Sequence, residues 1–222
     1  MKSSFNLDAK FERNSIEYLK DRKVFEKLGF SNFHFTDDRE TQLSGSDMVA
    51  DFDGKTEQVV DIKSVASMLP TFSQEIANGN SRRIGWIMNN ELKTDYYLYV
   101  WHNVEGESYY TAKKLIADDY SYISDTVVAL VSKKDVQKYI TDNTGIPCDE
   151  NNANKILRIS DRILKTNGTV YIWLDNGEIK AGKKRPNVPV YITRSDSIAE
   201  QPLNFIVRRS VLEKLGKNIL VK

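Results

Sequence analysis

The chain has 222 residues, of which 40% are hydrophobic and 28% are charged, as is usual for a globular protein. It has no apolar run of about 18 residues, and its first residues, MKSSFNLDAKFERN, lack the apolar core of a signal peptide, so we expect neither a membrane span nor export. The single cysteine, Cys148, excludes an internal disulfide, which fits the reducing cytoplasm. One cysteine with only two histidines also argues against a zinc cluster.

The net charge is only +1, but the charges are unevenly distributed along the chain. Residues 1–150 contain 18 Lys/Arg and 25 Asp/Glu, a balance of −7, whereas residues 151–222 contain 14 and 6, a balance of +8. We therefore expect a core over 1–150 and a basic C-terminal α+β extension over 151–222, although one domain is an alternative at this length. The basic part would face a polyanion such as nucleic acid, unless the two parts simply attract each other.

Apolar spacing and capping residues predict a first helix over 15–28 that ends at Gly29. Further helices are predicted at 109–118, 132–141, 152–166 and 210–218. Segments rich in β-branched and aromatic residues predict strands at 30–35, 48–52, 56–62, 84–88, 95–104 and 126–131. Asn176-Gly177 predicts a hairpin between strands at 169–174 and 178–181. Residues 64–81 have a mixed pattern, with Pro70 starting a loop or a short helix.

The segment 45–63, GSDMVADFDGKTEQVVDIK, places acidic residues and a lysine on two neighbouring strands. Asp61 and Lys63 share one face of the second strand, because strand side chains alternate in direction. Whether Asp47 joins them depends on the turn between the strands. A three-residue loop, which pairs Phe52 with Thr56, would bring Asp47 opposite Asp61, whereas a two-residue turn would place the two aspartates on opposite faces.

If the face is shared, the two carboxylates repel each other and favour a hard divalent cation between them. Mg²⁺ or Mn²⁺ held there would activate water against a phosphodiester. Lys63 would position that water or stabilise negative charge on oxygen. The alternative is that acidic residues and a lysine meet by chance on a solvated strand.

At these residues the chain resembles the PD-(D/E)xK nuclease superfamily. In that family an acid opens one strand of a hairpin and an acid-x-Lys motif closes the next, and Asp47, Asp61 and Lys63 match these positions. Ser46 stands where many members have proline, and the second acid is Asp where Glu is more frequent. The resemblance implies a restriction-endonuclease-like α/β fold, in which helices flank a mixed sheet.

The upstream segment SIEYLKDRKVFEKLGF, residues 15–30, is similar to the leading helix of archaeal Holliday junction resolvases. The resemblance implies that Glu17 is a third metal-linked carboxylate, with Glu12 in its place if the helix is rotated differently. In many such nucleases a residue of the next helix supports the metal or the phosphate. Gln74 and Glu75 are the candidates here, although an exposed loop is an equal alternative.

Basic residues near predicted strands and loops are candidates for contacts with nucleic-acid phosphates. They are Arg82, Arg83, Lys180, Lys183, Lys184, Arg185 and Arg194. A solvated basic surface that balances the acidic core is the alternative.

The expectation from the sequence is a metal-dependent endonuclease that hydrolyses DNA, with Mg²⁺ or Mn²⁺ as cofactor. Many members of the superfamily are dimers, so a homodimer is also expected. The main alternative is a nucleic-acid-binding protein that has the same fold and little or no catalysis. The sequence does not distinguish DNA from RNA, or duplex from branched or single-stranded substrates.

Overall fold

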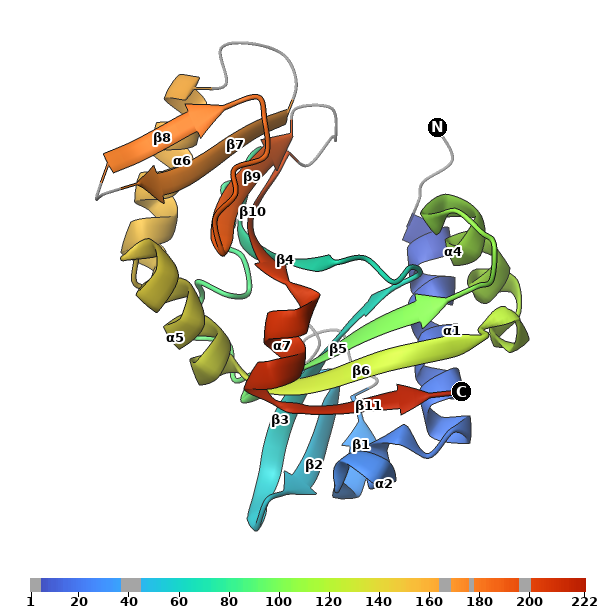
Figure 1. Cartoon of the computed structure of the whole chain (residues 1–222). Helices are drawn as coiled ribbons and strands as arrows, with labels where there is room; N and C mark the ends of the chain where they lie inside the picture. Colours follow the sequence, from blue (N-terminus) through green and yellow to red (C-terminus); the bar gives the residue numbers. More distant parts are fainter. Residues whose placement is uncertain (1–4, 37–44, 164–168, 176–177, 196–200) are drawn as a thin grey trace. The chain divides into compact units, whose positions relative to one another are not determined.

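The structure is a computed structural model of the chain, and it describes residues 5–36, 45–163, 169–175, 178–195 and 201–222. It is an α/β protein with a six-stranded mixed sheet and a five-stranded antiparallel sheet (Figure 1). Each sheet belongs to one of two compact units that interleave along the chain. The first unit comprises residues 1–69, 94–132 and 213–222, and the second comprises 70–93 and 133–212. This division differs from the single boundary expected near residue 150.

The first unit is built on the mixed sheet, whose strand order is β1-β2-β3-β5-β6-β11. β3 and β5 run parallel, and the other neighbouring strands run antiparallel. The elements of this unit are α1 (Phe5–Asp21), α2 (Val24–Leu28), β1 (Ser31–Phe35), β2 (Met48–Phe52), β3 (Lys55–Val65), β5 (Tyr96–Asn103), α4 (Tyr109–Asp118), a 3-10 turn (Tyr120–Tyr122), β6 (Asp125–Ser132) and β11 (Lys217–Val221).

One face of this sheet packs against α1 in an apolar core. Phe11, Tyr18 and Leu19 of α1 are almost fully buried there, together with Leu98 and Val100 of β5. Their spacing along α1 places them on one side of a helix, and burial of each large side chain contributes about 1.5–3 kcal/mol. Asn14 of α1 donates from Nδ2 to the carbonyl oxygen of Ile116 in α4 at 2.9 Å. The core and this bond set how α1 lies on the sheet.

The first helix differs in its limits from the expected helix over 15–28. α1 already begins at Phe5, because Phe11 extends its apolar side, and it ends at Asp21. Lys23 has a left-handed backbone (φ 52°), and α2 begins at the next residue. Gly29, with φ 95°, ends α2 as predicted.

The second unit is built on the antiparallel sheet, with strand order β4-β10-β9-β7-β8. Its elements are β4 (Thr71–Asn78), α5 (Lys133–Thr144), α6 (Glu150–Ile163), β7 (Thr169–Asp175), β8 (Glu178–Gly182), β9 (Val190–Ser195) and β10 (Pro202–Arg208), followed by α7 (Arg209–Leu215), whose last turn belongs to the first unit. β7 and β8 pair as predicted, whereas the Asn176-Gly177 turn lies outside the described residues. In the described part of the chain, no helix is long and apolar enough to cross a membrane.

Two expectations for residues 64–88 are corrected by the structure. Thr71–Asn78 forms β4, where a loop or a short helix was expected after Pro70, because alternate residues such as Phe72 and Ile76 are buried on one face. The expected strand over 84–88 is a series of turns joined to β4 by one bridge, Ala77 to Ile84. Gly85 fits there because a Cβ would lie only 2.2 Å from the carbonyl oxygen of Glu75.

Candidate functional site

The turn between β2 and β3 differs from the expected three-residue loop. Asp53 and Gly54, with φ of 51° and 74°, form a two-residue turn, and Phe52 pairs with Lys55. Positive φ at both turn residues is typical of tight hairpins. By itself, this turn would place Asp47 and Asp61 on opposite faces of the hairpin.

A β-bulge in β3, within three residues of the turn, shifts the pairing register between β2 and β3 by one residue. Beyond it, Ala50 pairs with Gln58 and Met48 with Val60, and the backbone N–H of Asp47 donates to Val60 at 3.0 Å. Glu57 is the extra residue, with φ 52°, and its N–H donates to the carboxylate of Asp51 at 3.2 Å. Continued by one residue beyond Met48 and Val60, this register places Asp47 opposite Asp61, which is the arrangement expected from a three-residue loop and is reached here by a bulge.

Asp47, Asp61 and Lys63 form a connected group of charged side chains. The Asp47 carboxyl group lies close enough to Asp61 to raise the pKa of the Asp61 side chain. The Lys63 Nζ lies 2.8 Å from Asp61 Oδ1, and Asp47 Oδ2 accepts the backbone N–H of Ile62 at 2.7 Å. Asp61 is only 3% exposed. The hairpin thus brings together the three residues that the sequence pattern selects.

Burial dominates the electrostatics of this group. It raises the pKa of Asp61 to about 7; Lys63 opposes this rise, and the negative charge of Asp47 adds to it. Burial also disfavours the charged form of Lys63, but Asp61, Asp47 and Glu12 together outweigh that effect and hold the Lys63 pKa above its usual value. The Asp61 carboxyl group therefore binds a proton more readily near neutral pH than an exposed aspartate does. A cation that displaced this proton would find carboxylate oxygens of Asp61 and Asp47 as ligands.

The helix acid that acts on this group is Glu12. Partial loss of solvent around its carboxyl group, and the negative charge of Asp47, raise the pKa of Glu12, while Lys63 opposes the rise. Glu12 and Glu17 are both exposed at the surface of α1, but Glu17 forms an ion pair with Lys20 at 2.9 Å. The structure therefore gives Glu12, the second choice from the sequence, the closer electrostatic link to Asp47.

A cavity of about 370 Å³ lies between α1 and the ends of β1, β2 and β3. Asp47, Glu12 and Glu17 line it, and so does Arg13, which the sequence analysis missed although it follows Glu12 directly. Asp61 and Lys63 are not among its described lining residues, since they alternate with Ile62 and Ser64, which are. Asp47, whose carboxylate accepts the backbone N–H of Ile62, thus presents its side chain to the cavity, whereas Asp61 is buried next to it.

Within the described ranges, no three or more His, Cys, Asp or Glu residues are placed to hold a metal ion together. Asp47 and Asp61 are two neighbouring carboxyl groups, and Glu12 is linked to Asp47 through its charge. Mg²⁺ is often held by one or two carboxylates, together with waters and substrate phosphate. The donor set therefore suits that ion by ligand type.

The secondary candidates Gln74 and Glu75 lie on β4 of the second unit, where a helix next to the motif was expected. Gln74 is fully buried and faces Phe205 in the β4–β10 register, while Glu75 faces Asn204. These positions serve the antiparallel sheet. They lend no support to a role at the cavity of the first unit.

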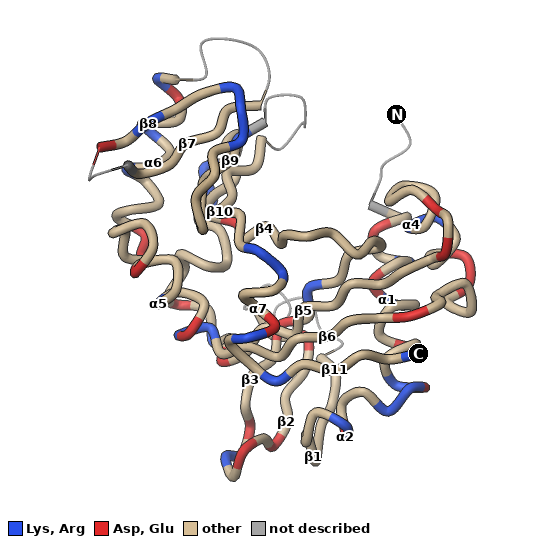
Figure 2. Tube along the Cα trace, in the orientation of Figure 1, with Lys and Arg blue, Asp and Glu red and all other residues tan. Residues whose placement is uncertain are grey.

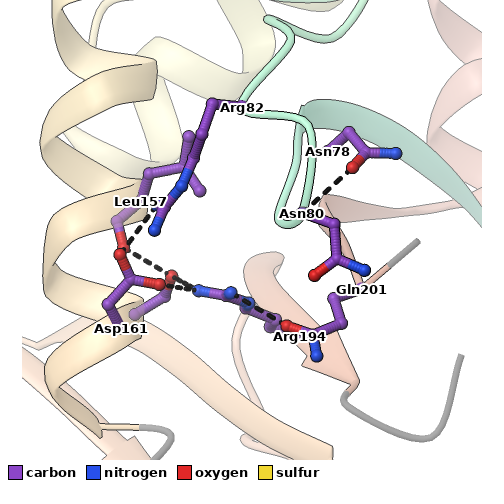
Figure 3. Close-up of polar contacts among 8 residues, drawn as sticks. Asn78, Asn80, Arg82, Leu157, Asp161, Arg194 and Gln201 are labelled. Carbon is purple, nitrogen blue, oxygen red and sulfur yellow. Dashed lines mark hydrogen bonds and ion pairs between the residues drawn. The ribbon is translucent and has the colours of Figure 1, made fainter. Parts of the chain in front are cut away.

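Two of the basic candidates are held in an internal ion-pair network. Arg194 is only 4% exposed, and its Nη1 lies 2.6 Å from Asp161 Oδ1 and 2.7 Å from Ser160 Oγ (Figure 3). Arg82 Nη1 lies 2.7 Å from the other oxygen of Asp161. The network joins α6, β9 and the segment after β4. The burial of Arg194 argues against its contacting a phosphate, and its role here is structural.

The remaining basic candidates are exposed in the second unit. They are Arg83, Lys180, Lys183, Lys184 and Arg185. Figure 2 shows basic residues gathered along the connection from β8 to β9. The guanidinium group of Arg185 lies 5.2 Å from the centre of the Tyr191 ring, which holds it in place at the surface.

Comparison of the chain with protein-family models, curated proteins and solved structures found no match. The functional interpretation therefore depends on the geometry and charge of the cavity and of the second unit's basic surface.

Proposed function

We propose that the chain is a metal-dependent nuclease with a restriction-endonuclease-like fold that hydrolyses DNA phosphodiester bonds. The observation that carries the proposal is that the hairpin brings Asp47, whose carboxylate accepts the Ile62 N–H at 2.7 Å, next to Asp61, with the Lys63 ammonium 2.8 Å from Asp61. The arrangement of a helix, an antiparallel hairpin and a following parallel strand on one mixed sheet supports it.

Asp47 and Asp61 would hold Mg²⁺ or Mn²⁺, with Glu12 as the third carboxylate. A bound divalent ion would supply Lewis-acid stabilisation of the phosphate and a more acidic water. The raised pKa of Asp61 supports this assignment, because a cation placed between two carboxylates would relieve the repulsion by Asp47 that contributes to that rise. The hard oxygen donors match both ions.

Lys63 would act on the attacking water or on the charge that develops on the phosphate oxygens. Its pKa above the usual value keeps it an ammonium at neutral pH, so it can donate hydrogen bonds but cannot accept a proton. It therefore orients water and stabilises negative charge, and general-base catalysis falls to another group. Arg13 and Lys20 place positive charge at the cavity itself, and Arg13 directly follows Glu12.

The second unit would supply most of the affinity for the DNA backbone. By sequence it carries 17 Lys/Arg and 11 Asp/Glu, a balance of +6, whereas the first unit carries 15 and 20, a balance of −5. The exposed basic residues between β8 and β9 would contact phosphates without reading base sequence. A homodimer that addresses both strands stays a prediction.

A second candidate is a nucleic-acid-binding protein that lacks catalysis. The observation that favours it is the burial of Asp61, which is paired with Lys63 and is not among the described lining residues of the cavity. A metal must reach this carboxyl group through or past Asp47.

A cleavage experiment distinguishes the two functions. Supercoiled plasmid and branched DNA are incubated with the wild type, Lys63→Ala and Lys55→Ala, in Mg²⁺, Mn²⁺ or EDTA. Lys55 is an exposed lysine on the same hairpin and serves as the matched control. The proposal expects cleavage by the wild type and Lys55→Ala only with metal, and a loss of at least 100-fold in Lys63→Ala. A wild type that binds DNA and cuts with neither metal supports the second candidate.

A further inference from the structure

A line of hydrogen bonds runs from the cavity into the core of the first unit. Ser64 Oγ of β3 lies 2.8 Å from Ser15 Oγ of α1, and Ser15 Oγ lies 2.7 Å from His102 Nε2 of β5. His102 Nδ1 lies 2.8 Å from Thr126 Oγ1 of β6. We call these four residues the buried polar line.

The surroundings of this line are apolar. Ser15, His102 and Thr126 are fully buried, and the rings of Phe11 and Tyr18 meet the imidazole edge-on, with centroids 6.1 and 5.5 Å away. Burial lowers the pKa of His102 to about 3, so its ring is neutral at physiological pH. One ring nitrogen then donates and the other accepts, and both have a partner.

The Ser15–His102 pair is not a nucleophile with its base. Neither residue is exposed, so no substrate reaches the serine oxygen. A neutral histidine with a pKa near 3 is also a poor proton acceptor at pH 7. The pair must therefore act within the fold.

The buried polar line is complete in one position of α1 only. A shift of α1 by one turn would place Phe11 or Leu19 where Ser15 now lies, and His102 Nε2 would lose its partner. A buried polar group without a partner costs about 1–3 kcal/mol. Buried polar contacts of this kind can define the register between packed elements, which apolar contacts alone specify less sharply.

The elements that the line joins are those that carry the candidate site. Glu12 precedes Ser15 by one turn on α1, and Lys63 precedes Ser64 on β3. We propose that Ser15 and His102 are positioning residues, which hold α1 so that the Glu12 carboxylate faces Asp47 and Lys63. This inference builds on the proposed metal site and adds residues that lie outside it.

The test measures Mn²⁺ affinity of the full chain by titration calorimetry. Ser15→Ala is expected to raise the Kd about 10-fold, as is usual when a supporting partner of a metal ligand is lost. In a Glu12→Gln background the same change is expected to have no effect, because the ligand that it positions is already lost. Leu19→Val, which trims a buried residue one turn further along α1, is the matched control, and it should lower Tm without changing the Kd.

A second variant and a second measurement cover the remaining outcomes. Thr126→Val keeps the shape of the side chain and removes the hydrogen-bond partner of His102 Nδ1. We expect it to raise the Kd for Mn²⁺ about 3-fold. If Ser15→Ala does not fold, this variant tests the inference in its place. Equal losses of Mn²⁺ affinity with and without Glu12 would overturn the inference.

If the wild type binds no Mn²⁺, the proposed function fails. Crystal structures of the wild type and Ser15→Ala then test the positioning of Glu12 by themselves. A displaced Glu12 in the variant supports the inference, and an unmoved Glu12 overturns it.

Discussion

Asp47 lies beside Asp61, with its carboxylate 2.7 Å from the backbone nitrogen of Ile62, although a two-residue turn links their strands. Such a turn alone would direct them to opposite faces, and the extra residue Glu57 restores the shared face. The geometry of the candidate site thus depends on a bulge at a solvent-exposed position. The raised pKa of Asp61 and the bulge at Glu57 can each be tested.

The stability of the metal-free protein should fall as pH rises from 5 to 8. The folded-state pKa of Asp61 is about 7, against a usual value of 3.8, so the native state binds more protons than the unfolded state in this range. The favourable contribution is complete below pH 4 and is lost as pH passes 7. At about 1.4 kcal/mol per pKa unit, the loss is at most about 4 kcal/mol.

Urea unfolding at pH 5 and pH 8, in EDTA, measures this dependence. Asp61→Asn removes the titrating group, so the difference between the two pH values should shrink to the smaller contribution of Glu12, whose pKa is also raised. A wild-type protein whose unfolding free energy rises from pH 5 to pH 8 would contradict the assignment.

Glu12 and Glu17 should differ sharply in their importance for DNA cleavage. Glu12→Gln removes the carboxylate that acts on Asp47 and Lys63, so cleavage should fall at least 100-fold and Mn²⁺ should bind more weakly. Glu17→Gln removes only an exposed ion pair with Lys20, worth less than about 1 kcal/mol, and cleavage should stay within about 2-fold of the wild type. The two rates are measured on one plasmid substrate. The reverse order would restore Glu17 as the third acid.

Deletion of Glu57 should separate the two aspartates. Without the extra residue, the two-residue turn sets the register along the whole hairpin, and Asp47 moves to the face opposite Asp61. Mn²⁺ binding, followed by calorimetry, should be lost. Glu57→Gly is the control, because it keeps the bulge and suits the positive φ of 52°. Normal Mn²⁺ affinity in the deletion variant would show that the shared face is not needed.

The surface between β8 and β9 should provide salt-dependent DNA affinity. Reversal of three exposed charges, Lys183→Glu, Lys184→Glu and Arg185→Glu, should weaken binding and reduce the slope of log K against log salt by about 3. Fluorescence anisotropy with a duplex at several salt concentrations measures both. Arg194→Met is the contrasting variant: it should lower stability through loss of the Asp161 pair while leaving the salt slope unchanged. An unchanged slope in the triple variant would move the binding surface elsewhere.

Much of the fold could be predicted from local patterns. The helices α4, α5 and α6 and the strands β5 and β6 follow from apolar periodicity and β-branched content, since both act over a few residues. β4 was missed because a polar residue, Gln74, occupies a buried position on its inner face, and pairing with the distant β10 decides its conformation. Long-range pairing of this kind leaves little trace in the local sequence.

The candidate site was predictable in its residues and less so in its geometry. The acid-x-Lys pattern identifies Asp61 and Lys63, but a bulge at a non-glycine residue with positive φ has no reliable sequence signature. The choice between Glu12 and Glu17 depends on the rotation of α1, which the burial of Phe11, Tyr18 and Leu19 sets together with Ser15. Arg194 looked like a surface residue because its partner, Asp161, lies 33 residues away in the sequence.

The most direct test of the central claim is the anomalous scattering of Mn²⁺ in a crystal of the wild-type protein at pH 8. The account predicts one peak that lies about 2.0–2.3 Å from an oxygen of Asp47 and from an oxygen of Asp61. A crystal in Mn²⁺ that shows no peak touching both carboxyl groups would contradict it.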